Sequence, residues 1–139
     1  MSGSEPLFAG VLETALYHES TEREAIERFY GELLALPLVA RWDDGLAFRV
    51  GAGVLLLFDR QGLEARAGPI ADHGASGPGH SCLRASREHY ERWRERLLEH
   101  GVEVLHDHDW SGGKRSFYFH DPAGNLLEIA DADLWPDGR

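Results

Sequence analysis

One pattern of predicted secondary structure occurs twice along the chain, and this repeat constrains the fold more than any other feature. The first copy has a strand at 11–17, a helix at 22–34 and strands at 38–42, 45–50 and 54–58. The second copy has a strand at 80–85, a helix at 88–100 and strands at 102–105, 115–120 and 125–130. A period of about 70 residues is too long for a solenoid. We therefore expect an α+β fold in which two βαβββ modules, about 8–60 and 77–133, form a pseudo-symmetric cupped mixed sheet with helices on its outer face.

Periodicity and turn chemistry define these elements. The first helix carries apolar residues at helical spacing, namely Ala25, Ile26, Phe29, Tyr30, Leu33 and Leu34. Gly101 stands where a helix-ending glycine belongs, and Asp121–Gly124 has the composition of a turn between two strands. The segment 60–78 is rich in Gly, Ala and Pro, so we expect a connection between the modules there.

Size, charge and cysteine content exclude several classes of protein. The chain has 139 residues, which suits one domain over 1–139, and a formal net charge of -10. This charge argues against binding to nucleic acid or to anionic membrane, and it is compatible with a cationic ligand. The single cysteine excludes an internal disulfide and fits a reducing compartment. No apolar stretch is long enough to span a membrane, and residues 1–6 lack a signal pattern, so we expect a cytoplasmic protein.

Four segments in order resemble the vicinal-oxygen-chelate superfamily of glyoxalases, bleomycin-resistance proteins and extradiol dioxygenases. They are the first strand and helix with Leu12–Thr14 and Glu27–Tyr30, the pair Gly79-His80, the run Phe117–Asn125, and Glu128. The resemblance covers the chain from Val11 to about Trp135 and implies a single glyoxalase/bleomycin-resistance-like domain.

The resemblance also implies one divalent metal ion in the cup, held by residues of the first and last strands of each module. The corresponding positions here are Glu13, His80 and Glu128, and the fourth position falls on Leu57, which cannot bind a metal. One imidazole and two carboxylates suit Zn, Ni, Mn or Fe(II) and leave positions open for water and substrate. Alternatively, Glu128 is a surface carboxylate and His80 a hydrogen-bonded core histidine. A carboxylate in an apolar strand, as at Glu13, is costly unless it is paired or metal-bound.

Three functions remain open. The first is a metal-dependent lyase, isomerase or transferase that chelates the vicinal oxygens of a small substrate. The second is a metal-free binding protein of the bleomycin-resistance type, which would hold a cationic or aromatic drug. The third is an extradiol dioxygenase, which Glu13 disfavours because those relatives use two histidines and one glutamate. Superfamily members commonly dimerise by pairing their modules, so a homodimer is expected, and a missing ligand could come from the partner chain.

Other polar residues have less defined roles. His106–Asp109 resembles a metal cluster in composition, but we expect a polar loop there. His73 could cover the cup, and His120 could point into it or lie solvated at a strand end. Several residues could hold a substrate at the rim or be ordinary surface residues, namely Arg84, Trp110, Lys114 and Arg115. A buried, inert thiol is expected at Cys82.

Overall fold

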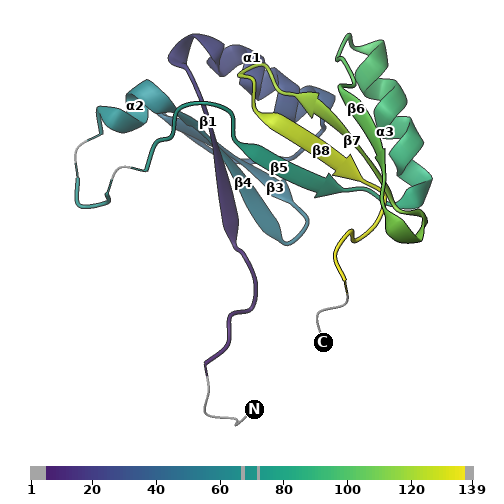
Figure 1. Ribbon diagram of the computed structural model, residues 1–139. Coiled ribbons are helices and arrows are strands. Elements are labelled where there is room, and N and C mark those ends of the chain that lie inside the picture. The colour runs from purple at the N-terminus through teal and green to yellow at the C-terminus, as the bar shows by residue number, and fades with distance from the viewer. Residues whose placement is uncertain (1–5, 67, 72, 137–139) are drawn as a thin grey trace.

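The computed structural model describes residues 6–66, 68–71 and 73–136, and it contains two four-stranded sheets (Figure 1). The first sheet has the order β1 (Glu13–His18), β4 (Gly53–Asp59), β3 (Gly45–Val50) and β2 (Leu38–Trp42). The second repeats that order with β5 (His80–Arg84), β8 (Leu126–Ala130), β7 (Arg115–His120) and β6 (His106–Asp109). Within each sheet the first strand pairs in parallel with the last, and the other pairs are antiparallel. The predicted α+β class and duplicated strand order are therefore confirmed, with the strands divided between two sheets. Residues 1–6 were predicted to lack a signal pattern, and most of them lie outside the described residues.

The helices follow the first strand of each module. In the first module η1 (Ser20–Glu22), α1 (Arg23–Arg28) and η2 (Phe29–Leu33) follow one another without a gap. In the second module α3 (Arg87–Glu99) begins after Ser86, whose hydroxyl accepts a hydrogen bond from the His89 amide as an N-cap. None of the helices in the described part of the chain is long and apolar enough to cross a membrane.

Two short helices and one strand differ from the prediction. The helices α2 (Arg60–Glu64) and η3 (Ser111–Gly113) were not predicted, and α2 occupies the start of the expected connection. A strand was predicted at 102–105, but it begins only at His106. Val102 and Val104 pack against the hydrophobic core, so their alternation reflects burial of side chains and not pairing with a neighbouring strand.

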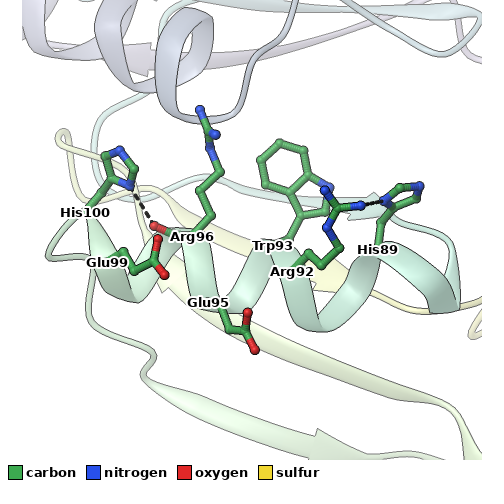
Figure 2. A pocket seen from close by; sticks show the side chains of 7 residues that line it. All are labelled: His89, Arg92, Trp93, Glu95, Arg96, Glu99 and His100. Carbon is green, nitrogen blue, oxygen red and sulfur yellow. Dashed lines mark hydrogen bonds between the residues drawn. The ribbon is translucent and has the colours of Figure 1, made fainter.

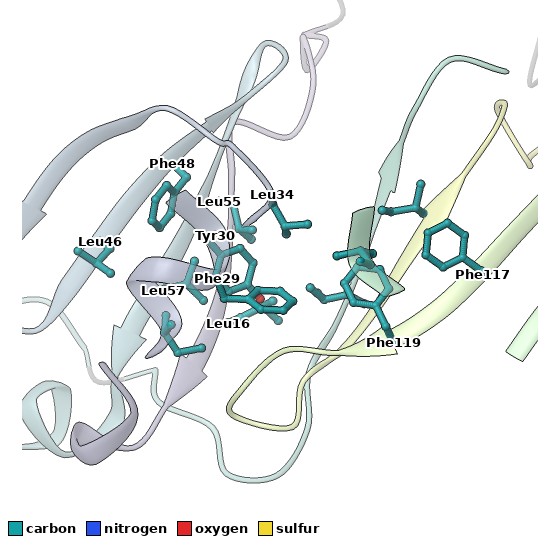
Figure 3. Packing of buried hydrophobic residues seen from close by; sticks show 14 of the residues in the cluster. Leu16, Phe29, Tyr30, Leu34, Leu46, Phe48, Leu55, Leu57, Phe117 and Phe119 are labelled. Atoms are coloured by element: carbon teal, nitrogen blue, oxygen red, sulfur yellow. The ribbon is translucent and has the colours of Figure 1, made fainter. Parts of the chain in front are cut away.

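One hydrophobic core joins both modules (Figure 3). Helix residues Phe29 and Tyr30 pack among buried side chains of both sheets, and the Phe29 and Phe119 rings lie 6.2 Å apart. The sheet residues that fill this core are Leu16, Leu46, Phe48, Leu55, Leu57, Phe117, Phe119, Leu127 and Ile129. The helices therefore cover one face of each sheet, as predicted, and the opposite face of the second sheet carries polar side chains, among them His80, Tyr118 and Glu128.

A buried polar network crosses the boundary between the modules. The Tyr30 hydroxyl donates to Asp121 Oδ2 over 2.6 Å, and Asn125 Nδ2 donates to the same oxygen over 2.9 Å. Asn125 Nδ2 also donates to the Tyr17 carbonyl oxygen, and Asn125 Oδ1 accepts from the Gly79 amide. Hydrogen bonds thus connect the turn between β7 and β8 to β1, to η2 and to Gly79, the residue before β5.

Replacing Tyr30 with phenylalanine is expected to lower the free energy of unfolding by about 1–2 kcal/mol at pH 7. The variant should also lose less stability above about pH 10 than the native protein does. Burial raises the pKa of Tyr30 well above its usual value, and the charge of Asp121 adds to this effect. In the unfolded chain tyrosine ionises near pH 10, so the stabilisation is fully present below about pH 10 and declines above it. Urea unfolding of both proteins between pH 7 and pH 11 measures the difference.

In the variant the free energy of unfolding should still decrease at alkaline pH, because burial also raises the pKa values of Tyr90 and Tyr118. Parallel stability curves for the two proteins above pH 10 would contradict the assignment to Tyr30.

Candidate metal centre

His80 and Glu128 meet on the polar face of the second sheet. They stand on neighbouring strands, β5 and β8, and His80 Nε2 lies 3.4 Å from Glu128 Oε1. The His80 side chain is 48% exposed, whereas that of Glu128 is only 6% exposed. The second carboxylate oxygen of Glu128, Oε2, is buried and has no hydrogen-bond partner among the described residues. A buried carboxylate without a full set of partners is costly, so this pair has the character of a site for a cation.

The hydrogen bond on the other side of the His80 ring strengthens this interpretation. His80 Nδ1 lies 2.9 Å from the Leu126 carbonyl oxygen, which can only accept, so Nδ1 is the protonated nitrogen. In the neutral ring Nε2 then turns a lone pair toward the Glu128 carboxylate. Two such groups repel unless a proton or a metal ion lies between them. Metal-bound histidines commonly donate their second ring N–H to a backbone carbonyl in this way.

Tyr118 and Cys82 flank Glu128 on the same face. Glu128 is paired in register with Cys82 of β5 and with Tyr118 of β7, and the Tyr118 and His80 rings stack at 6.4 Å. Burial raises the pKa of Cys82 to about 12, and the negative charge of Glu128 adds to it. Burial and Glu128 likewise raise the pKa of Tyr118. Both groups therefore keep their protons at neutral pH. Cys82 was expected to be buried, but it is exposed; its raised pKa nevertheless makes the thiol a poor nucleophile.

Glu13, the third predicted ligand, lies on the other sheet. It is an exposed residue at the start of β1, paired in register with Val54. It lines a groove of about 190 Å³ whose other wall includes Ser81 and Cys82. Among the described residues, no three or more His, Cys, Asp or Glu side chains come together as a group that could hold a metal ion. Within one chain, then, His80 and Glu128 are brought together and Glu13 is not.

The fourth metal position was assigned to the wrong residue. Glu13 is paired with Val54 as His80 is paired with Leu126, so the counterpart of Glu128 in the first module is Leu56 and not Leu57. Leu57 is fully buried in the core on the helix-covered face. A shift of one residue along a strand exchanges the two faces. Leucine at position 56 still provides no metal ligand.

The remaining candidates occupy defined places. His73 Nδ1 lies 2.6 Å from the Tyr17 hydroxyl, so His73 covers part of the first sheet. Arg115 forms ion pairs with Glu91 and Asp131, which suits a structural role. Three exposed residues belong to the polar side of the second sheet, namely Arg84, Trp110 and His120.

A separate groove of about 350 Å³ runs along α3 (Figure 2). Arg96 and Trp93 line it, and the Arg96 guanidinium donates hydrogen bonds to the carbonyl oxygens of Glu32 and Leu33 at the end of η2. No predicted ligand lines this groove, and its central arginine is used to join α3 to the first module. We therefore take the His80–Glu128 face as the candidate site.

Comparison with known proteins gives the family. Residues 21–129 match the model of the Glyoxalase/Bleomycin resistance protein/Dioxygenase superfamily. The chain is 34% identical to glutathione transferase FosA of Serratia marcescens over 102 residues, which are 73% of this chain and 67% of that protein. A crystal structure of lactoylglutathione lyase from Agrobacterium tumefaciens superposes with a TM-score of 0.85 at 36% identity, covering 93% of this chain and 98% of the other. A virulence protein from Salmonella typhimurium, at 22% identity and a TM-score of 0.69 over 90% and 98% of the two chains, shares the fold. The chain belongs to the Glyoxalase/Bleomycin resistance protein/Dioxygenase superfamily.

Proposed function

We propose that the protein is a metal-dependent enzyme of the glyoxalase group that acts on glutathione or a glutathione adduct. The observation that carries the proposal is the buried Glu128 carboxylate, with one oxygen facing His80 Nε2 and the other without a partner in the described chain. Two relatives at 34% and 36% identity, a glutathione transferase and a lactoylglutathione lyase, supply the substrate class.

The residues present fit a divalent metal ion. Two donors each about 2.0–2.2 Å from one tetrahedral ion are about 3.3–3.5 Å apart. His80 Nε2 and Glu128 Oε1 have that separation at 3.4 Å. His80 and Glu128 would hold Zn, Ni, Mn or Fe(II) from one chain, and Glu13 of a second copy would supply the third ligand across a homodimer interface. When bound, the ion would polarise a substrate oxygen and stabilise the charge that develops there.

Residues around the pair have separate tasks in this proposal. Tyr118, which keeps its proton at neutral pH, can donate a hydrogen bond to a substrate oxygen above Glu128. Arg84 is exposed on the same face of β5 as His80 and can attract a carboxylate of glutathione. The hydrogen bond from His80 Nδ1 to the Leu126 carbonyl oxygen orients the imidazole so that Nε2 is directed at the carboxylate, and the Tyr118 ring lies beside it.

Replacing Glu128 with glutamine is expected to abolish metal retention and to lower activity by at least about 100-fold, because the neutral amide cannot balance the ion. The protein is stripped with a chelator, equilibrated with Zn, Ni, Mn or Fe(II), desalted and analysed for metal content. Activity is assayed with glutathione plus an epoxide, for transfer, and with the thiohemiacetal of a 2-oxoaldehyde, for isomerisation. Glu103→Gln, at an exposed position outside the site, is the matched control and retains both properties.

If the protein instead binds a drug without a metal ion, the same experiments should give a different result. In that case the native chain and Glu128→Gln would both be desalted without metal, neither substrate would turn over, and a cationic aromatic drug would alter tryptophan fluorescence equally in both. This outcome would overturn the proposed function and support the drug-binding alternative, which the net charge of -10 favours.

A further inference from the structure

Two histidines lie side by side on the edge strand of the second sheet. A polar loop was expected at 106–109, but these residues form β6, an edge strand that pairs with β7. Successive side chains of a strand alternate between its faces, so His106 and His108 share one face. Their rings lie 5.3 Å apart, and His106 Nε2 is 3.1 Å from His108 Nδ1. The expectation of a polar loop at 106–109 is therefore wrong.

The distance between the two nitrogens suits chelation of one metal ion. Two imidazoles bound to the same ion at about 2.0–2.1 Å place their nitrogens about 2.8–3.4 Å apart, from square-planar to tetrahedral geometry. The two ring nitrogens share a hydrogen bond at 3.1 Å, a separation within this interval, so an ion that replaces the shared proton needs no movement of the strand. Both residues are exposed, which leaves the remaining coordination positions to water.

Aromatic side chains lie beside both rings. The His106 ring stacks on Tyr118 at 6.2 Å, and the His108 ring lies 4.4 Å from Trp110. Trp110 is itself fixed by a 2.9 Å hydrogen bond from its indole nitrogen to the Ser116 hydroxyl. A chelating pair that is ordered before binding loses less conformational entropy when the ion arrives.

The strand itself is anchored from its other face. Asp107 forms two hydrogen bonds of 2.9 and 2.8 Å with the Arg94 guanidinium of α3. This carboxylate is therefore committed to the helix and is not a third ligand. The donor set of the pair is two imidazoles, in contrast to the imidazole and carboxylate at His80 and Glu128.

We propose that His106 and His108 form a second site for a divalent transition metal ion, separate from the His80–Glu128 pair and selective for Zn²⁺, Ni²⁺ or Cu²⁺. Imidazole nitrogens favour these ions over Mg²⁺ and Ca²⁺, which prefer oxygen ligands. With two protein ligands the site is weaker than a three-ligand centre, and its ion is removed by desalting. The acidic chain, with a net charge of -10, raises the local concentration of cations around it.

The test uses Cu²⁺ and the full chain carrying Glu128→Gln, which removes the first site. Cu²⁺ is titrated while tryptophan fluorescence is recorded, because bound Cu²⁺ quenches a nearby indole and Trp110 adjoins His108. The electron paramagnetic resonance spectrum of the one-to-one mixture reports how many nitrogens bind the ion. His106→Asn and His108→Asn are compared with His89→Asn, an exposed histidine on α3.

We expect saturable quenching with one Cu²⁺ per chain, two equatorial nitrogens, and at least tenfold weaker binding in each of His106→Asn and His108→Asn. His89→Asn is expected to change the affinity less than twofold. Equal affinities in all variants, or a spectrum without two nitrogen ligands, would overturn the proposal. Because Glu128 is already replaced, and because the variants can be assayed separately with Glu128 intact, failure here is distinguishable from failure of the proposed enzyme activity.

Discussion

Replacing Asp121 with alanine is expected to lower the free energy of unfolding by about 3–5 kcal/mol, because several buried donors lose their acceptor together. The carboxylate accepts hydrogen bonds from the Tyr30 hydroxyl, the Asn125 side chain and the backbone amides of Ala123 and Asn125. Asp121 is 4% exposed, so water does not replace the lost acceptor without opening the structure. Urea and thermal unfolding followed by circular dichroism measure the change.

Asp133→Ala provides the matched control for this experiment. Asp133 is exposed near the end of the described chain and accepts one hydrogen bond, from the Trp135 amide, so the same substitution should cost less than about 1 kcal/mol. A loss at Asp121 no larger than that at Asp133 would show that the buried network contributes little to stability.

Mixing two inactive variants is expected to restore activity. Glu13→Ala and Glu128→Ala would each lack one ligand in every site of a homodimer. If Glu13 of one copy completes the His80–Glu128 pair of the other, a heterodimer of these variants has one intact site and one doubly altered site. Random reassortment of equal amounts makes half of the dimers heterodimers, so about a quarter of the sites, and of the native activity, should return.

The control for mixing pairs His80→Ala with Glu128→Ala. These two residues come from the same chain, 3.4 Å apart, so both sites of the heterodimer remain damaged and no activity should return. Recovery in this control as well, or no recovery in the first mixture while both variants remain dimeric by light scattering, would contradict a shared site.

Much of the fold was predictable because local sequence and tertiary structure agree. The strands β2, β3 and β7 have the bounds that alternation predicted, and the helix expected at 88–100 is found at Arg87–Glu99. The secondary-structure prediction was wrong where an alternating pattern of apolar residues reflects burial in the core and not strand pairing. Val102 and Val104 fill the core without forming a strand, and the alternating polar residues of β6 carry no apolar signal at all.

The candidate site was predictable only in part. His80 and Glu128 were expected together and lie together, since neighbouring strands of one module bring them into contact. Leu56 was missed because a one-residue shift in register is invisible without the pairing partners. The place of Tyr118 between His80 and His106 depends on the pairing of four strands, so no spacing along the sequence could reveal it.

The contacts of the turn that carries Asp121 and Asn125 limit where residues can be inserted into the chain or deleted from it. Asn125 reaches the end of β1 and the start of β5 through one side chain, so an inserted residue in this turn would displace contacts in both sheets at once. The turn at Gly51 and Ala52 between β3 and β4 is exposed, and among the described residues no side-chain hydrogen bond connects it to the other sheet. We therefore expect insertions and deletions to be tolerated better at the second turn than at the first, although both join adjacent antiparallel strands.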